Sequence, residues 1–172
     1  MERIFGMATA HITMQTSLGL EPDRLSAITF RPVSSGYFDQ AADELNDLLK
    51  LSTRDTGASF RTHSDNYGFD WIILEDSDFE DMVATIHVVS TTLIEHQFGD
   101  RILAALFRFH DRNDRAVYWF YNFRRGMFYP FIPTGPQERD NAEEMRLANL
   151  LDGEMPIEKD FERWYPMWEI PF

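Results

Sequence analysis

Cysteine is absent from the 172 residues, and lysine is nearly so. Without a thiol, the chain can form neither a disulfide framework nor a thiolate nucleophile nor a cysteine-based zinc or iron–sulfur site. Lys50 and Lys159 are the two lysines, and the other 14 of the 16 basic residues are arginines. An acidic chain that is poor in lysine is typical of a protein from a high-salt cytoplasm, although its aromatic content of 15% is high for that class.

Positive charge and long apolar runs are also scarce. The 16 basic residues are set against 29 acidic ones, which leaves a formal net charge of −13. Because a nucleic-acid binder needs a basic surface to neutralise phosphates, this balance argues against a nucleic-acid partner. No stretch approaches about 18 consecutive apolar residues, and the first residues lack the apolar run of a signal peptide. We therefore expect a cytoplasmic protein that does not insert into a membrane.

Helix and strand patterns alternate along the chain, with neither a linker nor a repeat. Apolar residues recur at helical spacing in four segments: Met7–Ser17, Phe38–Leu49, Asp78–Gln97 and Asn141–Leu151. Alternating or wholly apolar runs predict six strands: Leu25–Arg31, Ser59–His63, Phe69–Glu75, Arg101–His110, Arg115–Phe123 and Met127–Pro133. Because hairpins lie between helices, we predict a single α+β domain over residues 1–172. Its mostly antiparallel sheet of about five to six strands is flanked by helices, in the order α-β-α-β-β-α-β-β-β-α.

Residues that satisfy unpaired backbone groups mark the expected ends of the helices. Ser34 or Ser35 can cap the second helix. Ser77 with Glu80 three residues later forms a capping box for the third helix, and Gly99 is its expected C-terminal stop.

The strands expected after residue 100 are apolar on both faces. Such a sheet needs cover on both sides, either from helices of the same chain or from another chain, and the sequence leaves both open. Pro130 lies within the last of these strands and cannot donate a backbone hydrogen bond. It predicts an edge strand or a bulge, where a partner can approach.

The five histidines are the candidates for acid–base or metal chemistry. His87 and His96 lie nine residues apart on the expected third helix, which points them in opposite directions, so they cannot share an ion. His87 follows Val83 by four residues and is interpreted as a histidine at the edge of the core, bonded to a strand. The alternative is a functional general base or ligand at His87. His110-Asp111 is interpreted as a strand end running into a turn. We predict no catalytic residue, no metal site and no cofactor.

A cluster of arginines and aromatic residues is the candidate site. Arg124 and Arg125 occupy a tight turn, and Phe128, Tyr129 and Phe131 follow on the next strand. Guanidinium groups can grip a carboxylate or phosphate with two parallel hydrogen bonds, and aromatic rings can anchor a partner. We predict a partner-binding surface at these five residues. The alternative is that the arginines solvate a turn while the rings belong to the core.

Four stretches resemble the PspA-associated protein family PspAB: Phe30–Pro32, Asp65–Trp71, Arg124–Phe131 and Trp164–Trp168. The resemblance covers the chain from about Phe5 to Trp168. Members of the family often carry a longer segment before the position of Phe5, so we expect any function of that segment to be missing here.

The resemblance implies a non-enzymatic accessory protein of a PspA-type membrane-stress, or phage-shock, response. The implied partners are a PspA-like coiled-coil protein and an HtpX-type membrane protease. The family brings no agreed catalytic residues. Since a net charge of −13 disfavours direct docking on an anionic membrane, we expect recruitment to the inner face of the membrane through a partner.

Two rival functions stay open at this point. One is a dimeric adaptor similar to secretion chaperones, which is an analogy of fold alone. The other is a small-molecule enzyme or sensor, which needs a pocket with a titratable group such as His87 among the aromatic residues. The oligomeric state stays open as well.

Overall fold

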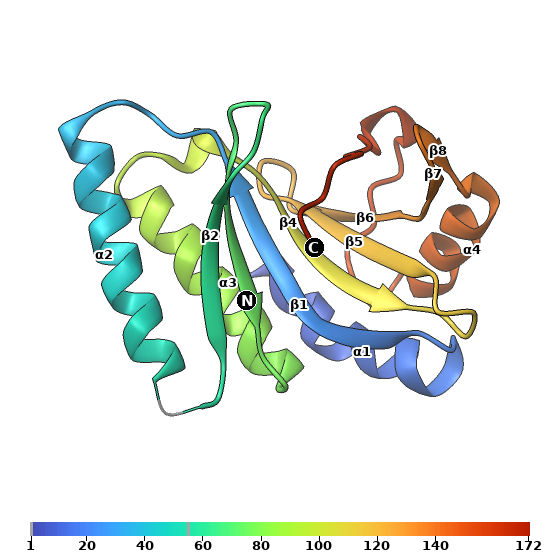
Figure 1. Cartoon of the computed structure of the whole chain (residues 1–172). Coiled ribbons are helices and arrows are strands. Elements are labelled where there is room, and N and C mark those ends of the chain that lie inside the picture. Colours follow the sequence, from blue (N-terminus) through green and yellow to red (C-terminus); the bar gives the residue numbers. More distant parts are fainter. Residues whose placement is uncertain (1, 55) are drawn as a thin grey trace. The chain divides into compact units, whose positions relative to one another are not determined.

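The computed structural model describes residues 2–54 and 56–172, and the chain divides into two compact units (Figure 1). The middle unit comprises residues 24–105, whereas the terminal unit combines the residues up to 23 with residues 106–172. Helices and antiparallel strands build both units, which confirms the predicted α+β class. The first six strands along the chain, three of them mainly in each unit, match the predicted number. A further pair of short strands lies in the terminal unit. The prediction of a single domain over residues 1–172 stays a prediction.

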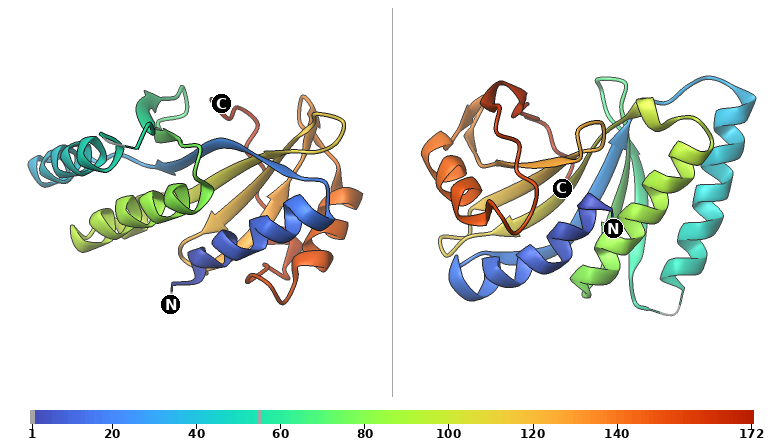
Figure 2. Two further views of the ribbon diagram at one scale, coloured as in Figure 1. Left: turned by 90° about the horizontal axis from the view of Figure 1, so that it is seen from below. Right: turned by 180° about the vertical axis from the view of Figure 1, so that it is seen from behind.

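Three strands and two long helices form the middle unit. The strands lie in the order β2 (Ser59–Ser64), β3 (Asp70–Glu75) and β1 (Glu21–Phe30), the last of which begins in the terminal unit. Both pairings are antiparallel, with Ile72 of β3 between Thr62 and Ile28. The helices are α2 (Gly36–Thr53) and α3 (Phe79–Glu95), which pack against each other (Figure 2). A short 3-10 turn, Gly99–Arg101, precedes β4.

Polar side chains cap the first turns of both helices. The Ser35 hydroxyl accepts a hydrogen bond from the Phe38 N–H at 3.1 Å, which confirms one of the two caps predicted for α2. For α3, the predicted capping residue Ser77 is wrong. Asp78 is the N-cap, and its carboxylate accepts a hydrogen bond from the Asp81 N–H at 3.1 Å. The helix starts one residue later than a Ser77 cap requires, because Asp78 itself has an extended backbone conformation.

A left-handed residue ends α3, but it is a glutamine. Gln97 has a φ of 67°, and its N–H bonds to the carbonyl of Ile94 while the Phe98 N–H bonds to that of Leu93. This is the Schellman pattern, in which glycine is the usual residue. The predicted stop at Gly99 is therefore wrong by two residues.

The terminal unit consists of helices around an aromatic sheet. Its helices are α1 (Gly6–Ser17) and α4 (Asn141–Leu151), and 3-10 turns lie at Arg3–Phe5 and Phe161–Arg163. Its strands are β4 (Ile102–His110, which begins in the middle unit), β5 (Ala116–Asn122), β6 (Met127–Phe131) and the short pair β7 (Pro133–Gly135) and β8 (Glu138–Arg139). The pair β7 and β8 was not predicted, since strands this short carry no periodic pattern. All residues of 117–121 are buried, so at β5 the chain itself covers both apolar faces.

The C-terminal part of the chain covers the outer side of β6. Pro130 lies in this strand, which is the last in the sheet order, so the predicted edge strand is confirmed. Phe128 nevertheless pairs outward with Ile157 in a parallel bridge. Its N–H donates to the Pro156 carbonyl at 2.7 Å, and its carbonyl accepts from the Glu158 N–H at 2.8 Å. This edge is therefore not free to receive another strand.

A buried ion pair joins β6, β8, α4 and the chain after α4. The Glu144 side chain on α4 is fully buried, and both of its oxygens accept hydrogen bonds from Arg139 Nε at 2.9 Å. One of these oxygens also accepts the N–H of Ile132 at 2.8 Å. The remaining Arg139 nitrogens donate to the carbonyls of Trp164 at 2.8 Å and Pro130 at 3.3 Å.

The surroundings of this pair are apolar. The Arg139 guanidinium lies 4.9 Å from the centre of the Phe131 ring, a cation–π contact. Burial raises the pKa of Glu144 above its ordinary value of 4.5, although the hydrogen bonds from Ile132 and Arg139 oppose that shift. Neither partner of such a pair can be removed without leaving an unpaired polar group among aromatic rings.

Arg115 joins the turn before β5 to the start of α4. It contacts Asp111 at 3.1 Å and Asp140, the N-cap of α4, at 2.9 Å. Burial raises the pKa of Asp111, but hydrogen bonds from Arg115 and from the Asn113 N–H outweigh it, and the net shift is downward. Hydrogen bonds from the Glu143 N–H and from Arg115 lower the pKa of Asp140.

Replacing Arg139 by alanine is expected to destabilise the protein by about 3–5 kcal/mol, because it leaves the buried Glu144 carboxylate without its partner. Arg146→Ala is the control. It removes the ion pair that the exposed Arg146 makes with Glu143 one turn earlier on α4, and this should cost about 0.5 kcal/mol or less. Urea unfolding followed by tryptophan fluorescence measures both. Equal losses for the two variants would contradict the structural role of Arg139.

Replacing Asp140 by asparagine tests the charge at the N-cap of α4. The folded pKa of Asp140 lies below 3.8, so its stabilisation is present above pH 3.8 and is lost as the pH falls through the folded value. Asparagine keeps the oxygen that caps the helix but loses the charge and the second oxygen, which accepts from Arg115. The difference in unfolding free energy between the wild type and Asp140→Asn is therefore expected to be largest near pH 7 and to close below pH 3.8. A difference that stays constant with pH would argue against this assignment.

Candidate functional site

The turn between β5 and β6 holds Arg124 and Arg125 in place through Asn122. The Asn122 side-chain oxygen accepts hydrogen bonds from the N–H groups of Arg124 at 3.0 Å and Arg125 at 3.3 Å. Gly126 closes the turn with a φ of 65°, and Arg3 lies so close that an added Cβ would come within 2.9 Å of its Cδ. Glycine is favoured here by its positive φ, whereas the exposed Arg3 side chain could move away from a Cβ.

The two arginines of the turn have different surroundings. Arg125 pairs with the buried carboxylate of Glu158 through two nitrogens, each at 3.0 Å. This hydrogen bond raises the pKa of the Arg125 guanidinium. Arg124 is exposed, and among the described residues no ion pair involves its side chain. Arg124 thus offers a cation to a partner, while Arg125 is partly neutralised.

The three rings of the predicted surface lie in the interior. Phe128, Tyr129 and Phe131 are buried, as expected if the rings belong to the core. The Tyr129 hydroxyl donates to the Tyr165 carbonyl at 2.9 Å, and its ring stacks on Trp164. Burial raises the pKa of Tyr129, which keeps the hydroxyl protonated as a donor. Since buried rings cannot be reached without unfolding, the accessible part of the predicted surface consists of Arg124 and Arg125. The partner-binding role of these residues stays a prediction.

The segment after α4 brings a third arginine beside this turn and carries exposed rings next to that arginine in the chain. Arg163 lies 3.8 Å from Glu158, the carboxylate that also binds Arg125, so the two guanidinium groups are neighbours. Phe161 and Tyr165 flank Arg163 in the chain and are 55% and 57% exposed. We name Arg124, Arg125, Phe161, Arg163 and Tyr165 the arginine–aromatic surface. Arginine and tyrosine are the residue types that most often dominate binding energy at protein interfaces.

The sequence indicated only part of this surface. The tryptophans of residues 164–168, the tail of the chain, indicate a segment that packs on the body, and the buried ring of Trp164 stacks on that of Tyr129. Trp164 also donates its ring N–H to the Glu158 carbonyl at 3.0 Å. Nothing in the spacing of Arg125 and Arg163 indicated that they share one carboxylate, because that contact depends on the chain crossing back along β6.

The histidines lie apart from one another. His87 is half-buried on α3. His96 pairs with Glu44 of α2 at 2.8 Å, and His110 pairs with Asp23. Asp111 accepts the N–H groups of Asn113 and Arg115 at 2.9 Å, which is the turn role expected for it. In residues 2–54 and 56–172, no three histidine or acidic side chains gather in a way that could hold a metal ion.

Removing the Tyr129 hydroxyl tests how much the hydrogen bond to the Tyr165 carbonyl, which attaches the tail to β6, contributes to stability. Tyr129→Phe leaves the Tyr165 carbonyl without its donor and is expected to cost about 1 kcal/mol of unfolding free energy. Tyr37→Phe is the control, because Tyr37 is 80% exposed and should change stability hardly at all. Thermal or urea unfolding measures both, and an unchanged stability for Tyr129→Phe would mean that this bond does not hold the tail.

Comparison with protein-family models gives a match that spans the whole chain. Residues 1–172 match the model of the family PspAB, described as PspA associated protein B. Comparison with curated proteins and with solved structures found no match. Among the described helices, none is both long and apolar enough to cross a membrane. The match covers every stretch on which the resemblance was based, and the chain therefore belongs to the PspAB family.

Proposed function

We propose that this chain is a non-enzymatic accessory protein of a PspA-type membrane-stress response and that it acts by binding protein partners. The observation that supports this most strongly is the family match over residues 1–172, since the family is described as PspA-associated. We propose a cytoplasmic location with recruitment to the membrane through the partner. The net charge of −13 favours such an indirect route, because an anionic lipid surface repels an acidic protein.

The arginine–aromatic surface is the proposed contact for the PspA-like protein. It gathers three of the 16 basic residues in an acidic chain, next to two exposed rings. Glu158 and Asp160 neutralise part of this charge, whereas Arg124 carries no described counterion. A partner that offers carboxylates beside an apolar strip would complement it. An HtpX-type protease as a second partner rests on the family resemblance alone.

Binding to the PspA-like protein of the same organism tests the proposal. The double variant Arg124→Glu with Phe161→Ser changes two exposed side chains of the surface and is expected to weaken binding by about tenfold or more. Arg146→Glu on α4 is the charge-matched control and should bind within about twofold of the wild type. Biolayer interferometry at the salt concentration of the native cytoplasm gives the affinities.

Two outcomes separate the parts of the proposal. No binding of the folded wild type to the folded PspA-like protein would overturn the proposed function. Equal binding by the double variant and by Arg146→Glu would leave the association standing but would overturn the arginine–aromatic surface as its site.

A further inference from the structure

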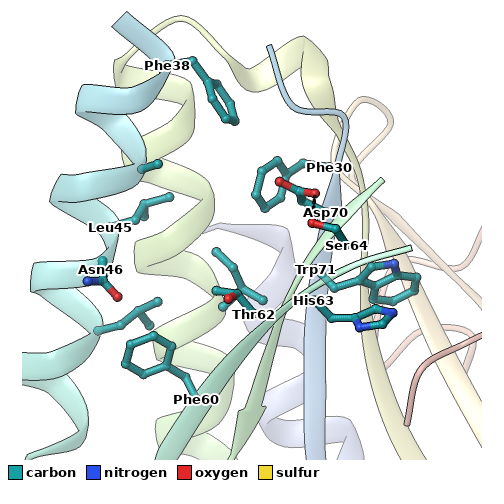
Figure 3. Close-up of a pocket in the computed structure, with 13 residues that line it drawn as sticks. Phe30, Phe38, Leu45, Asn46, Phe60, Thr62, His63, Ser64, Asp70 and Trp71 are labelled. Atoms are coloured by element: carbon teal, nitrogen blue, oxygen red, sulfur yellow. Dashed lines mark hydrogen bonds between the residues drawn. The ribbon is translucent and has the colours of Figure 1, made fainter. Parts of the chain in front are cut away.

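The middle unit contains a cavity between α2 and the strand β2 (Figure 3). Its volume is about 240 Å³, enough for one or two apolar side chains of a partner. Phe38 and Leu45 point into it from α2, and Phe60 points into it from β2 (Figure 3). Ala42 and Asn46 line the same cavity and are exposed, so it opens to solvent along α2.

Beside this cavity, β2 presents an open edge. It is the first strand in the sheet order, and in the described residues it pairs with β3 alone. Five of its six residues are exposed, and it contains neither proline nor a bulge. Natural sheets usually protect such an edge with proline, charge or a covering segment. In the terminal unit, β6 has both Pro130 and the covering residues 156–158, whereas β2 carries one charged residue, Arg61.

Bonded and non-bonded residue pairs alternate along β2 and β3, and this alternation shows which backbone groups of β2 face outward. The Asp65 N–H donates to the Phe69 carbonyl, so this pair and every second pair along the hairpin bond to each other. The outward groups of β2 therefore belong to Phe60, Thr62 and Ser64. The side chains of these three residues also line the cavity. A strand added at this edge would place every second side chain beside theirs, at the opening under α2.

Charge around the cavity favours a cationic occupant. The helix α2 carries four acidic residues and one lysine, Lys50. Asp39 and Asp43 lie one turn before the exposed lining residues Ala42 and Asn46. Asp70 lines the cavity itself and accepts a hydrogen bond from Ser64.

We propose that β2 receives an extended segment of a partner protein as an additional strand, in which apolar side chains that enter the cavity and lysine or arginine side chains beside them lie on the same face. The inference rests on the proposed function and names the kind of partner segment that the middle unit takes. Main-chain hydrogen bonds to Phe60, Thr62 and Ser64 supply affinity. The apolar cavity and its acidic rim select the side chains.

The probe, called the lysine–valine peptide, is a fluorescein-labelled nonapeptide with lysine at both ends, valine at the middle odd positions and threonine at the even positions, so that lysine and valine share one face of an extended strand. Ala42→Trp fills the opening and is expected to weaken binding by about tenfold or more. Gln40→Trp is the matched control, because Gln40 is exposed on α2 but lies about 200° around the helix from Ala42, and it should bind within about twofold of the wild type.

A second pair of variants addresses the strand edge. Thr62→Pro removes an outward N–H without touching the ladder to β3, and it is expected to weaken binding about as much as Ala42→Trp. Thr62→Val keeps the N–H and should bind like the wild type. Circular dichroism confirms folding, and if Thr62→Pro does not fold, the Ala42 and Gln40 variants decide the question alone.

Amide hydrogen exchange gives a readout that non-specific charge attraction would not produce. Phe60, Thr62 and Ser64 are expected to gain protection when the lysine–valine peptide binds, while Arg61 and His63 change little because their N–H groups already bond to β3. Equal binding of a peptide with glutamate in place of lysine, or of one in which valine and threonine exchange positions so that lysine and valine lie on opposite faces, would overturn the proposal. So would a dimer that pairs through β2 in the absence of peptide, since the occupant would then be a second copy.

The peptide assay uses no PspA-like protein, so its outcome is independent of the proposed function. A wild type that binds the PspA-like protein but ignores the peptide would overturn this inference and leave the proposed function standing. A wild type that binds the peptide but not the PspA-like protein would overturn the proposed function and leave the added strand at β2 standing.

Discussion

The pair of Arg139 and Glu144 is the constraint on which the terminal unit depends. A buried carboxylate needs every lone pair satisfied, and Glu144 obtains its donors from Arg139 and from the N–H of Ile132 just after β6. The remaining nitrogens of Arg139 donate hydrogen bonds to the carbonyls of Pro130 and Trp164. One ion pair thus sets the position of α4, of β8 and of the aromatic tail together.

This arrangement explains why the exposed part of the arginine–aromatic surface lies where it does. Once Trp164 is held, the chain before it runs along β6, and Glu158 comes within reach of both Arg125 and Arg163. Packing of Tyr129 and Trp164 beneath then leaves neighbouring rings outside. The surface is therefore the outer side of a packed aromatic core.

The sequence predicted elements well where a periodic pattern and a local cap agree. Ser35 caps α2 as expected, and α4 spans the predicted Asn141–Leu151. It failed at the two ends of α3, where Asp78 rather than Ser77 has the capping conformation and Gln97 rather than glycine takes the positive φ. At both ends the residue that caps the helix was the one whose backbone took the required conformation, and neighbouring residues offered the same side-chain chemistry only at the first end.

The candidate site was predictable only in part. Periodic patterns predicted the α+β class, local residues predicted the arginine turn, and the resemblance indicated the family, because each depends on residues that are close in the sequence. Burial of Phe128, the shared carboxylate of Arg125 and Arg163, and the open edge of β2 beside its cavity were decided by tertiary structure alone. An aromatic strand looks the same in sequence whether it faces solvent or core, and only the segments packed against it, distant in the chain, determine which.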